Sequence, residues 1–147
     1  MSEIRDGVKT KPFNQQVHDA CDPPAREAVI KYIKDTWGLN AWHNPNKYAV
    51  DLIIERDKEA IGYAEIEMRD WDHCPFKTIH IPKRKDKLFE NDRHTIYFVV
   101  SRGITKAWYI NSQVIKTSSV HEIPNKAVSQ GEYFYDVPLY LFTEVNL

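Results

Sequence analysis

Two glutamates lie one residue apart in the segment "GYAEIEMR", which begins at Gly62 and is typical of a β-strand. Side chains alternate along a strand, so Glu65 and Glu67 share one face of the predicted sheet. Two neighbouring carboxylates repel each other. Either this face is exposed to solvent, with Arg69 relieving the repulsion, or the two carboxylates bind a cation.

Asp51 favours the cation, because it interrupts the apolar run "YAVDLIIE" and an unpaired buried carboxylate is costly. The polar segment "RDKEA" joins this run to the strand that carries the glutamates, which predicts an antiparallel hairpin. An odd-length loop, residues 57–59, places Asp51 opposite Glu65 and Ala49 opposite Glu67. All three carboxylates then share one face. Since Mg²⁺ prefers carboxylate oxygens, the sequence predicts a divalent metal site there.

A helix is predicted before the hairpin, in "CDPPAREAVIKYIKDTWGLN". Asp22 can cap this helix, Pro23 suits its first position and Gly38 suits its end. Apolar residues recur every four positions and define a face that packs on a core: Ala25, Val29, Ile33 and Trp37.

Four further elements are predicted after the hairpin. The segment "PKRKDKLFEND" favours a short helix with Pro82 near its start, and "HTIYFVVSRG" favours a central strand buried on both faces. The segment "TKAWYINSQVI" favours another strand, and Pro138 in "GEYFYDVPLYLF" favours an edge or an irregular end. We therefore expect a single α/β domain over 1–147, with a mixed central sheet flanked by helices, an irregular lead-in over 1–21 and an extended aromatic tail over about 124–147.

This order of elements resembles the PD-(D/E)xK nuclease superfamily, the fold of many restriction and phage endonucleases. The resemblance covers roughly Asp22 to Ile110 and rests on a strand Asp followed by an acid-x-basic type motif on the returning strand. It implies an α-β-β-β-α-β core and hydrolysis of DNA with Mg²⁺, for which Mn²⁺ is a substitute. It also implies metal binding by Asp51 and Glu65, by the Ile66 carbonyl and, as in some members, by an acid on the first helix, here Glu27.

The sequence departs from the family motif at two positions. Val50 replaces the motif proline, and Glu67 replaces the motif lysine. Either Glu67 acts as a general base or further metal ligand, or the chain is a catalytically inactive relative that binds nucleic acid or a protein partner. Lys47 and Lys83 are candidates for a displaced catalytic cation, although both also suit a solvated surface.

A basic segment follows the predicted metal strand. Residues 77–93 contain six Lys or Arg and three Asp or Glu. Such a segment can bind DNA phosphates, or it can be a solvated helix face. Four candidate DNA contacts lie in it: Lys83, Arg84, Lys85 and Lys87.

The overall composition bounds the class of protein. The chain has 147 residues, 42% hydrophobic and 28% charged, with a formal charge of −1, as expected for a soluble globular domain. The sequence has no signal-peptide pattern or membrane-length apolar run, so we expect a cytoplasmic protein with no membrane partner. The spacing of His18, Cys21, His73 and Cys74 suits a zinc site poorly, and reduced thiols are expected. The sequence leaves open whether the chain forms a homodimer.

Overall fold

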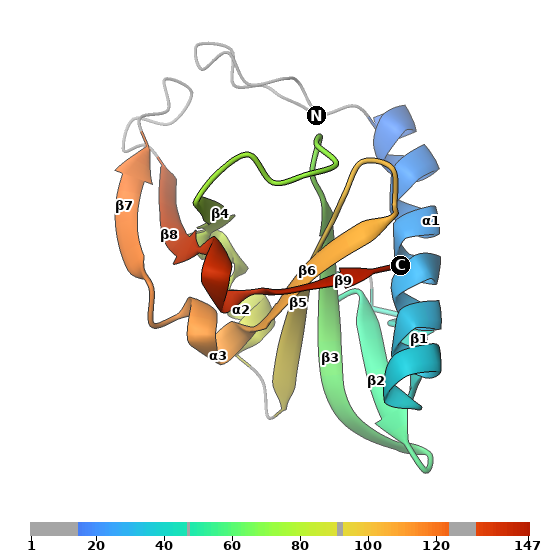
Figure 1. The fold of residues 1–147 in the computed structure, drawn as a ribbon. Helices are drawn as coiled ribbons and strands as arrows, with labels where there is room; N and C mark the ends of the chain where they lie inside the picture. Colours follow the sequence, from blue (N-terminus) through green and yellow to red (C-terminus); the bar gives the residue numbers. More distant parts are fainter. Residues whose placement is uncertain (1–14, 47, 91–92, 124–131) are drawn as a thin grey trace.

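The computed structural model describes residues 15–46, 48–90, 93–123 and 132–147. These residues form a mixed α/β fold with a six-stranded sheet and a three-stranded sheet (Figure 1). The six-stranded sheet has the order β1 (Asn40–His43), β2 (Leu52–Arg56), β3 (Glu59–Met68), β5 (His94–Val100), β6 (Lys106–Asn111) and β9 (Thr143–Asn146). The three-stranded sheet has the order β4 (Thr78–Pro82), β8 (Glu132–Pro138) and β7 (Ser119–Ile123).

The helical elements are α1 (Gln15–Tyr32), which continues as the π-helical turn η2 (Ile33–Trp37), then η3 (Lys83–Lys85), α2 (Asp86–Phe89), α3 (Ser112–Ile115) and η4 (Leu139–Leu141). In the described part of the chain, only α1 is longer than two turns. No helix there combines the length and apolar character needed to cross a bilayer.

Helix α1 begins earlier than predicted. Residues 15–21 of the predicted lead-in are helical, and Pro23 and Pro24 lie inside the helix rather than at its start; residues 1–14 lie outside the described structure. Proline lacks the N–H that a helix interior needs, so the sequence favoured a start at Pro23. The predicted end at Gly38 is confirmed, because its φ is 69° and its N–H donates to the carbonyls of Ile33 and Lys34.

The predicted hairpin register is confirmed. Leu52 pairs with Ala64 and Ile54 pairs with Gly62, so continuing the ladder by one residue brings Asp51 opposite Glu65. The apolar side chains of both strands then point toward α1, where Leu52, Ile54, Ala64 and Ile66 are buried in one core cluster.

The predicted odd-length loop is wrong. The turn has two residues, Asp57 and Lys58, which both have positive φ (50° and 70°). The odd residue lies instead in β3, where Ile61 is a bulge between the Ile54↔Gly62 and Glu55↔Ala60 pairs. A bulge adds one residue to one strand, so it restores the register that the two-residue turn alone would not give.

Strand β5 is the central strand that the sequence predicted. It runs parallel to β3 and antiparallel to β6, and Tyr97, Phe98, Val99 and Val100 are all 0% exposed. Phe98 and Val100 pack in the cluster on the α1 side, whereas Tyr97 and Val99 pack in the cluster on the other side. A strand between two apolar layers is apolar at successive positions, which explains its sequence.

The layer opposite α1 differs from the prediction of a sheet flanked by helices. The three-stranded sheet lies on that side, together with the one-turn helices α2 and α3 (Figure 1). The predicted extended tail contains β8, which is the middle strand of that sheet rather than an edge, and Pro138 is the last residue of β8; residues 124–131 of the predicted tail lie outside the described structure. A proline at a strand end interrupts few ladder hydrogen bonds, so it does not exclude a central strand.

Candidate functional site

Asp51 and Glu65 meet where the β2–β3 ladder ends. Beyond the Leu52↔Ala64 pair, the Ile66 N–H on β3 donates to Asp51 Oδ2 at 2.8 Å. The Asp51 N–H donates in turn to Glu65 Oε1 at 3.2 Å. Each carboxylate therefore accepts a backbone hydrogen bond from the other strand, which fixes the two side chains relative to each other.

Glu65 is the buried member of this pair, with 6% of its surface exposed. Its neighbours Ala64 and Ile66 face α1, so Glu65 faces the opposite layer, from which η3 brings Lys85. Lys85 Nζ lies 2.9 Å from Glu65 Oε2. Because a single ion pair does not replace the lost hydration, burial raises the pKa of Glu65 to about 7, with the Asp51 charge adding to the rise and Lys85 opposing it.

A second cation approaches from α1. Arg26 lies 3.7 Å from Asp51 Oδ1, measured from its Nη2 atom. The carboxylate pair therefore lies between Arg26 on one side of the sheet and Lys85 on the other. This arrangement offsets the two negative charges and holds the carboxylate oxygens in place.

Glu67 has different partners. The hydroxyl of Tyr97 donates to Glu67 Oε1, and Arg69 Nη2 lies 3.6 Å from the same oxygen. Arg69 also donates to the His80 carbonyl at 2.8 Å, which fixes its position. These contacts hold Glu67 toward β5 and Arg69.

The predicted cluster of three carboxylates is therefore reduced to the pair Asp51 and Glu65. Across the described ranges, no three His, Cys, Asp or Glu side chains come together as a metal-ion site. Glu27, the predicted ligand from the helix, is exposed, and its Oε2 atom forms a hydrogen bond of 2.6 Å with His43 Nε2. Helix α1 instead presents Arg26 to Asp51. Lys47 lies outside the described residues.

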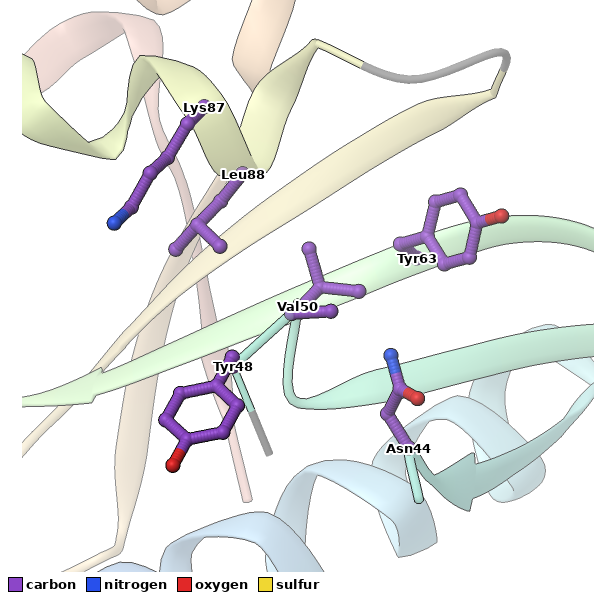
Figure 2. A pocket seen from close by; sticks show the side chains of 7 residues that line it. Asn44, Tyr48, Val50, Tyr63, Lys87 and Leu88 are labelled. Carbon is purple, nitrogen blue, oxygen red and sulfur yellow. The ribbon is translucent and has the colours of Figure 1, made fainter. Parts of the chain in front are cut away.

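Most of the predicted DNA contacts in the basic segment form ion pairs within the chain. Lys83 lies 3.0 Å from Asp86, Arg84 lies 2.6 Å from Glu132, and Lys85 contacts Glu65. Lys87 makes no ion pair with any residue that the structure describes, and it lies at a cleft (Figure 2). Of the four predicted DNA contacts, Lys87 is the one whose charge is not already offset within the described chain.

This cleft is lined by residues close to the carboxylate pair in sequence and has a volume of about 330 Å³. Its lining comes from α2, β3 and the segment before β2: Asn44, Tyr48, Ala49, Val50, Tyr63, Lys87 and Leu88. Val50 directly precedes Asp51, and Tyr63 lies two residues before Glu65 on the same face of β3. The cleft is thus lined by close sequence neighbours of the carboxylate pair, although neither Asp51 nor Glu65 lines it (Figure 2).

Three residues of the site were not predicted in these roles: Arg26, Lys85 and Tyr97. Tyr97 had a usable signal, because a tyrosine in an otherwise apolar buried strand needs a partner for its hydroxyl. Lys85 had no local signal, since its approach to Glu65 depends on the path of the chain between β3 and β5. The prediction that α1 contributes a side chain at Asp51 named Glu27, whereas the residue that contacts Asp51 is its sequence neighbour Arg26.

No protein-family model matches the chain, and comparisons with curated proteins and with solved structures give no match. The geometry of the site is therefore the basis for a functional conclusion.

Proposed function

We propose that this protein is a Mg²⁺-dependent DNA endonuclease that hydrolyses phosphodiester bonds at Asp51 and Glu65. One observation supports this function most directly: each of the two carboxylates accepts a backbone hydrogen bond from the other strand where the β2–β3 ladder ends, and the Lys85 ammonium lies 2.9 Å from Glu65. The order α1, β1, β2, β3, α2 and β5, with β5 parallel to β3, also supports the proposal, although β4 and η3 lie between β3 and α2 in the chain.

The residues present fit a Mg²⁺ ion. This cation is commonly held by one or two carboxylates, with water and substrate phosphate oxygens completing its shell. Asp51 and Glu65 supply the carboxylates. The Ile66 N–H points to Asp51, and in a strand the carbonyl of the same residue points to the same side, so the Ile66 carbonyl would be a third oxygen ligand. When bound, Mg²⁺ supplies Lewis-acid chemistry that activates water and offsets phosphate charge.

Lys85 is the best candidate for the cation that the motif loses at Glu67. Its ammonium contacts Glu65 and lies 6.0 Å from the centre of the Tyr97 ring, so it is held at the site from two directions. An ammonium fixed there stabilises negative charge that develops on a phosphate oxygen. Lys83, the earlier candidate, is paired with Asp86 instead.

The charge of Glu65, and with it the cation affinity of the proposed site, should depend on pH near neutrality. With its pKa raised to about 7, this carboxyl holds a proton in an appreciable fraction of molecules near neutral pH. A cation competes with that proton, since a ligating carboxylate must be ionised. Cation binding should therefore strengthen as pH rises through 7.

A catalytically inactive module that binds nucleic acid or a protein partner is the second candidate. Its support is specific: Arg26 and Lys85 already offset the charges of Asp51 and Glu65, and Glu67 is bonded to Tyr97. In that case these contacts only stabilise the fold, and no metal ion replaces Arg26 or Lys85 at the carboxylates.

Supercoiled plasmid cleavage separates the two candidates. The wild type should nick plasmid with Mg²⁺ or Mn²⁺ and not with EDTA. Asp51→Asn should abolish nicking, and Lys85→Gln should slow it by about 100-fold, the usual loss for one charge-stabilising donor. Glu59→Gln, on the exposed hairpin end, is the matched control and should nick normally. DNA binding by a folded wild type without metal-dependent nicking would favour the inactive module.

A further inference from the structure

A second cleft is built from the segment that follows β3 and from β4. It has a volume of about 200 Å³, and its lining residues are Arg69, Trp71, Phe76, Thr78, Ile79 and His80. These residues are distinct from those that line the cleft in Figure 2 and from the carboxylate pair. Pockets that enclose drug-sized ligands have volumes of roughly 300–1,000 Å³, so this smaller cleft suits a single ring.

The second cleft has two aromatic side chains that differ in their packing. Trp71 packs edge-on against Trp108, with ring centroids 5.1 Å apart, so the core fixes its position. Phe76 is 60% exposed, and its ring contacts no other aromatic ring in the part of the chain that the structure describes. The Phe76 ring is therefore available to stack on a flat ligand in this cleft.

Arg69 brings a hydrogen-bond donor to the second cleft. Its Nη2 donates to the His80 carbonyl at 2.8 Å and lies 3.6 Å from Glu67 Oε1, so the guanidinium is held in place and its charge is partly offset. Its Nε is buried and has no hydrogen-bond partner among the described residues. A buried N–H without an acceptor is costly, which favours a ligand with a carbonyl over a hydrocarbon ring. Because Glu67 already offsets the charge of Arg69, a neutral carbonyl is favoured over an anion.

We infer that the second cleft binds one unpaired nucleobase that carries a ring carbonyl, such as thymine. The base stacks on Phe76, and its carbonyl accepts from the Arg69 Nε. The Thr78 hydroxyl can donate to or accept from another polar atom of the base. A base in a duplex is stacked and cannot enter such a cleft without leaving its pair. This site goes beyond the proposed nuclease function, because it uses neither carboxylate of the pair and needs no metal.

Titration with thymidine in EDTA, followed by heteronuclear NMR, tests the inference without any cleavage. The indole N–H signal of Trp71 reports on the cleft directly. Phe76→Ala should weaken thymidine binding by about 5-fold or more, the lower end of one lost stacking contact. Phe76→Tyr keeps the ring and should bind as the wild type does. Tyr133→Ala is the matched control, because Tyr133 is also exposed (49%) but does not line the cleft, and it should have no effect.

Arg69→Lys gives an independent test of the carbonyl contact, because lysine keeps the positive charge and lacks the Nε donor. This variant should bind thymidine about 5-fold or more weakly than the wild type does. Its affinity for adenosine, whose base has no ring carbonyl, should stay close to that of the wild type. Arg84→Lys, at an arginine of η3 outside the cleft, is the matched control and should leave both affinities unchanged.

A short oligothymidylate distinguishes the two sources of such a base. Tighter binding than thymidine, with the same dependence on Phe76, assigns the site to an unpaired base within a DNA strand. Equal binding of the two probes assigns it to a free nucleoside.

Four results overturn the inference: no saturable thymidine binding by the wild type, equal binding by Phe76→Ala and the wild type, equal losses in Phe76→Ala and Phe76→Tyr, or equal losses of thymidine and adenosine binding in Arg69→Lys. Failure of the proposed nuclease function is a separate result, because it leaves Phe76-dependent thymidine binding in EDTA while plasmid nicking is absent. Nicking that persists without thymidine binding refutes the nucleobase site alone.

Discussion

Replacing Glu65 with glutamine should make the protein more stable at alkaline pH. The pKa of Glu65 is raised from its ordinary value of 4.5 to about 7, mainly by burial. Between these values the folded chain binds more protons than the unfolded chain. The free energy of unfolding of the wild type should therefore fall as pH rises from about 4.5 to about 7, and should then level off.

The magnitude follows from the difference between 4.5 and about 7. At about 1.4 kcal/mol for each pH unit, the ionised carboxylate costs roughly 3 kcal/mol of stability above the upper value. The side chain is only 8% exposed, so solvent screening reduces this figure little. Glutamine has the shape of the protonated acid and no charge at any pH. The variant should match the wild type near about pH 4 and exceed it by up to roughly 3 kcal/mol at about pH 8.

Thermal unfolding followed by circular dichroism in EDTA measures this difference. A gain of about 3 kcal/mol corresponds to roughly 6–12 °C in Tm for a chain of this size. Glu59→Gln, exposed at the hairpin end, controls for the general effect of losing one negative charge. The reasoning is refuted if Glu65→Gln and the wild type have parallel pH profiles. Added Mg²⁺ at alkaline pH should raise the Tm of the wild type but not of Glu65→Gln, since only a ligand of the folded state stabilises it.

Three further substitutions test other parts of the site and fold. Lys85→Gln removes the charge that opposes the rise in the Glu65 pKa, so the pH range of the wild-type stability loss should move upward, measured by the same pH series. Tyr97→Phe removes the hydroxyl donor of half-buried Glu67 and should lower the free energy of unfolding by about 1.5 kcal/mol or more in urea titrations; an unchanged value would mean that Arg69 alone satisfies Glu67. Gly38→Ala meets no atom within 4 Å but places alanine at a φ of 69°, so it should cost about 1 kcal/mol through backbone strain alone, measured by urea unfolding.

The register of the central hairpin could be predicted because both strands bury one face. Alternation requires Leu52 and Ile54 on one strand, and Ala64 and Ile66 on the other, to point to the same apolar layer. That requirement limits the partner of Asp51 to a residue on its own face, and the Leu52↔Ala64 pair makes that partner Glu65. The bulge at Ile61 could not be predicted, because Asp57 and Lys58 lack the glycine that normally indicates a two-residue turn with positive φ.

The second sheet and the cation at Glu65 depend on contacts between segments distant in sequence. Strand β8 is central because β4 and β7 pair with it on both sides, and neither pairing leaves a local pattern in the tail. In the sequence, Lys85 cannot be distinguished from the neighbouring surface lysines. Its contact with Glu65 depends on the path of the chain between β3 and β5. The start of α1 was predicted wrongly because a local signal was given too much weight. Proline favours the first position of a helix, but α1 begins at Gln15 and continues through Pro23.

The environment of Glu65 is the main physical support for the proposed cation site. A neutral side chain at this position would leave the fold more stable above pH 7, because the ionised carboxylate is buried beside the Asp51 charge. The chain nevertheless has two carboxylates here, and it supplies Lys85 and Arg26 on either side to hold them. Buried acids whose pKa is shifted by burial and by a second acid at a cleft are typical of binding and catalytic sites. Under the proposed function, a bound cation would recover the stability that the ionised Glu65 costs, because it offsets the charges of Asp51 and Glu65.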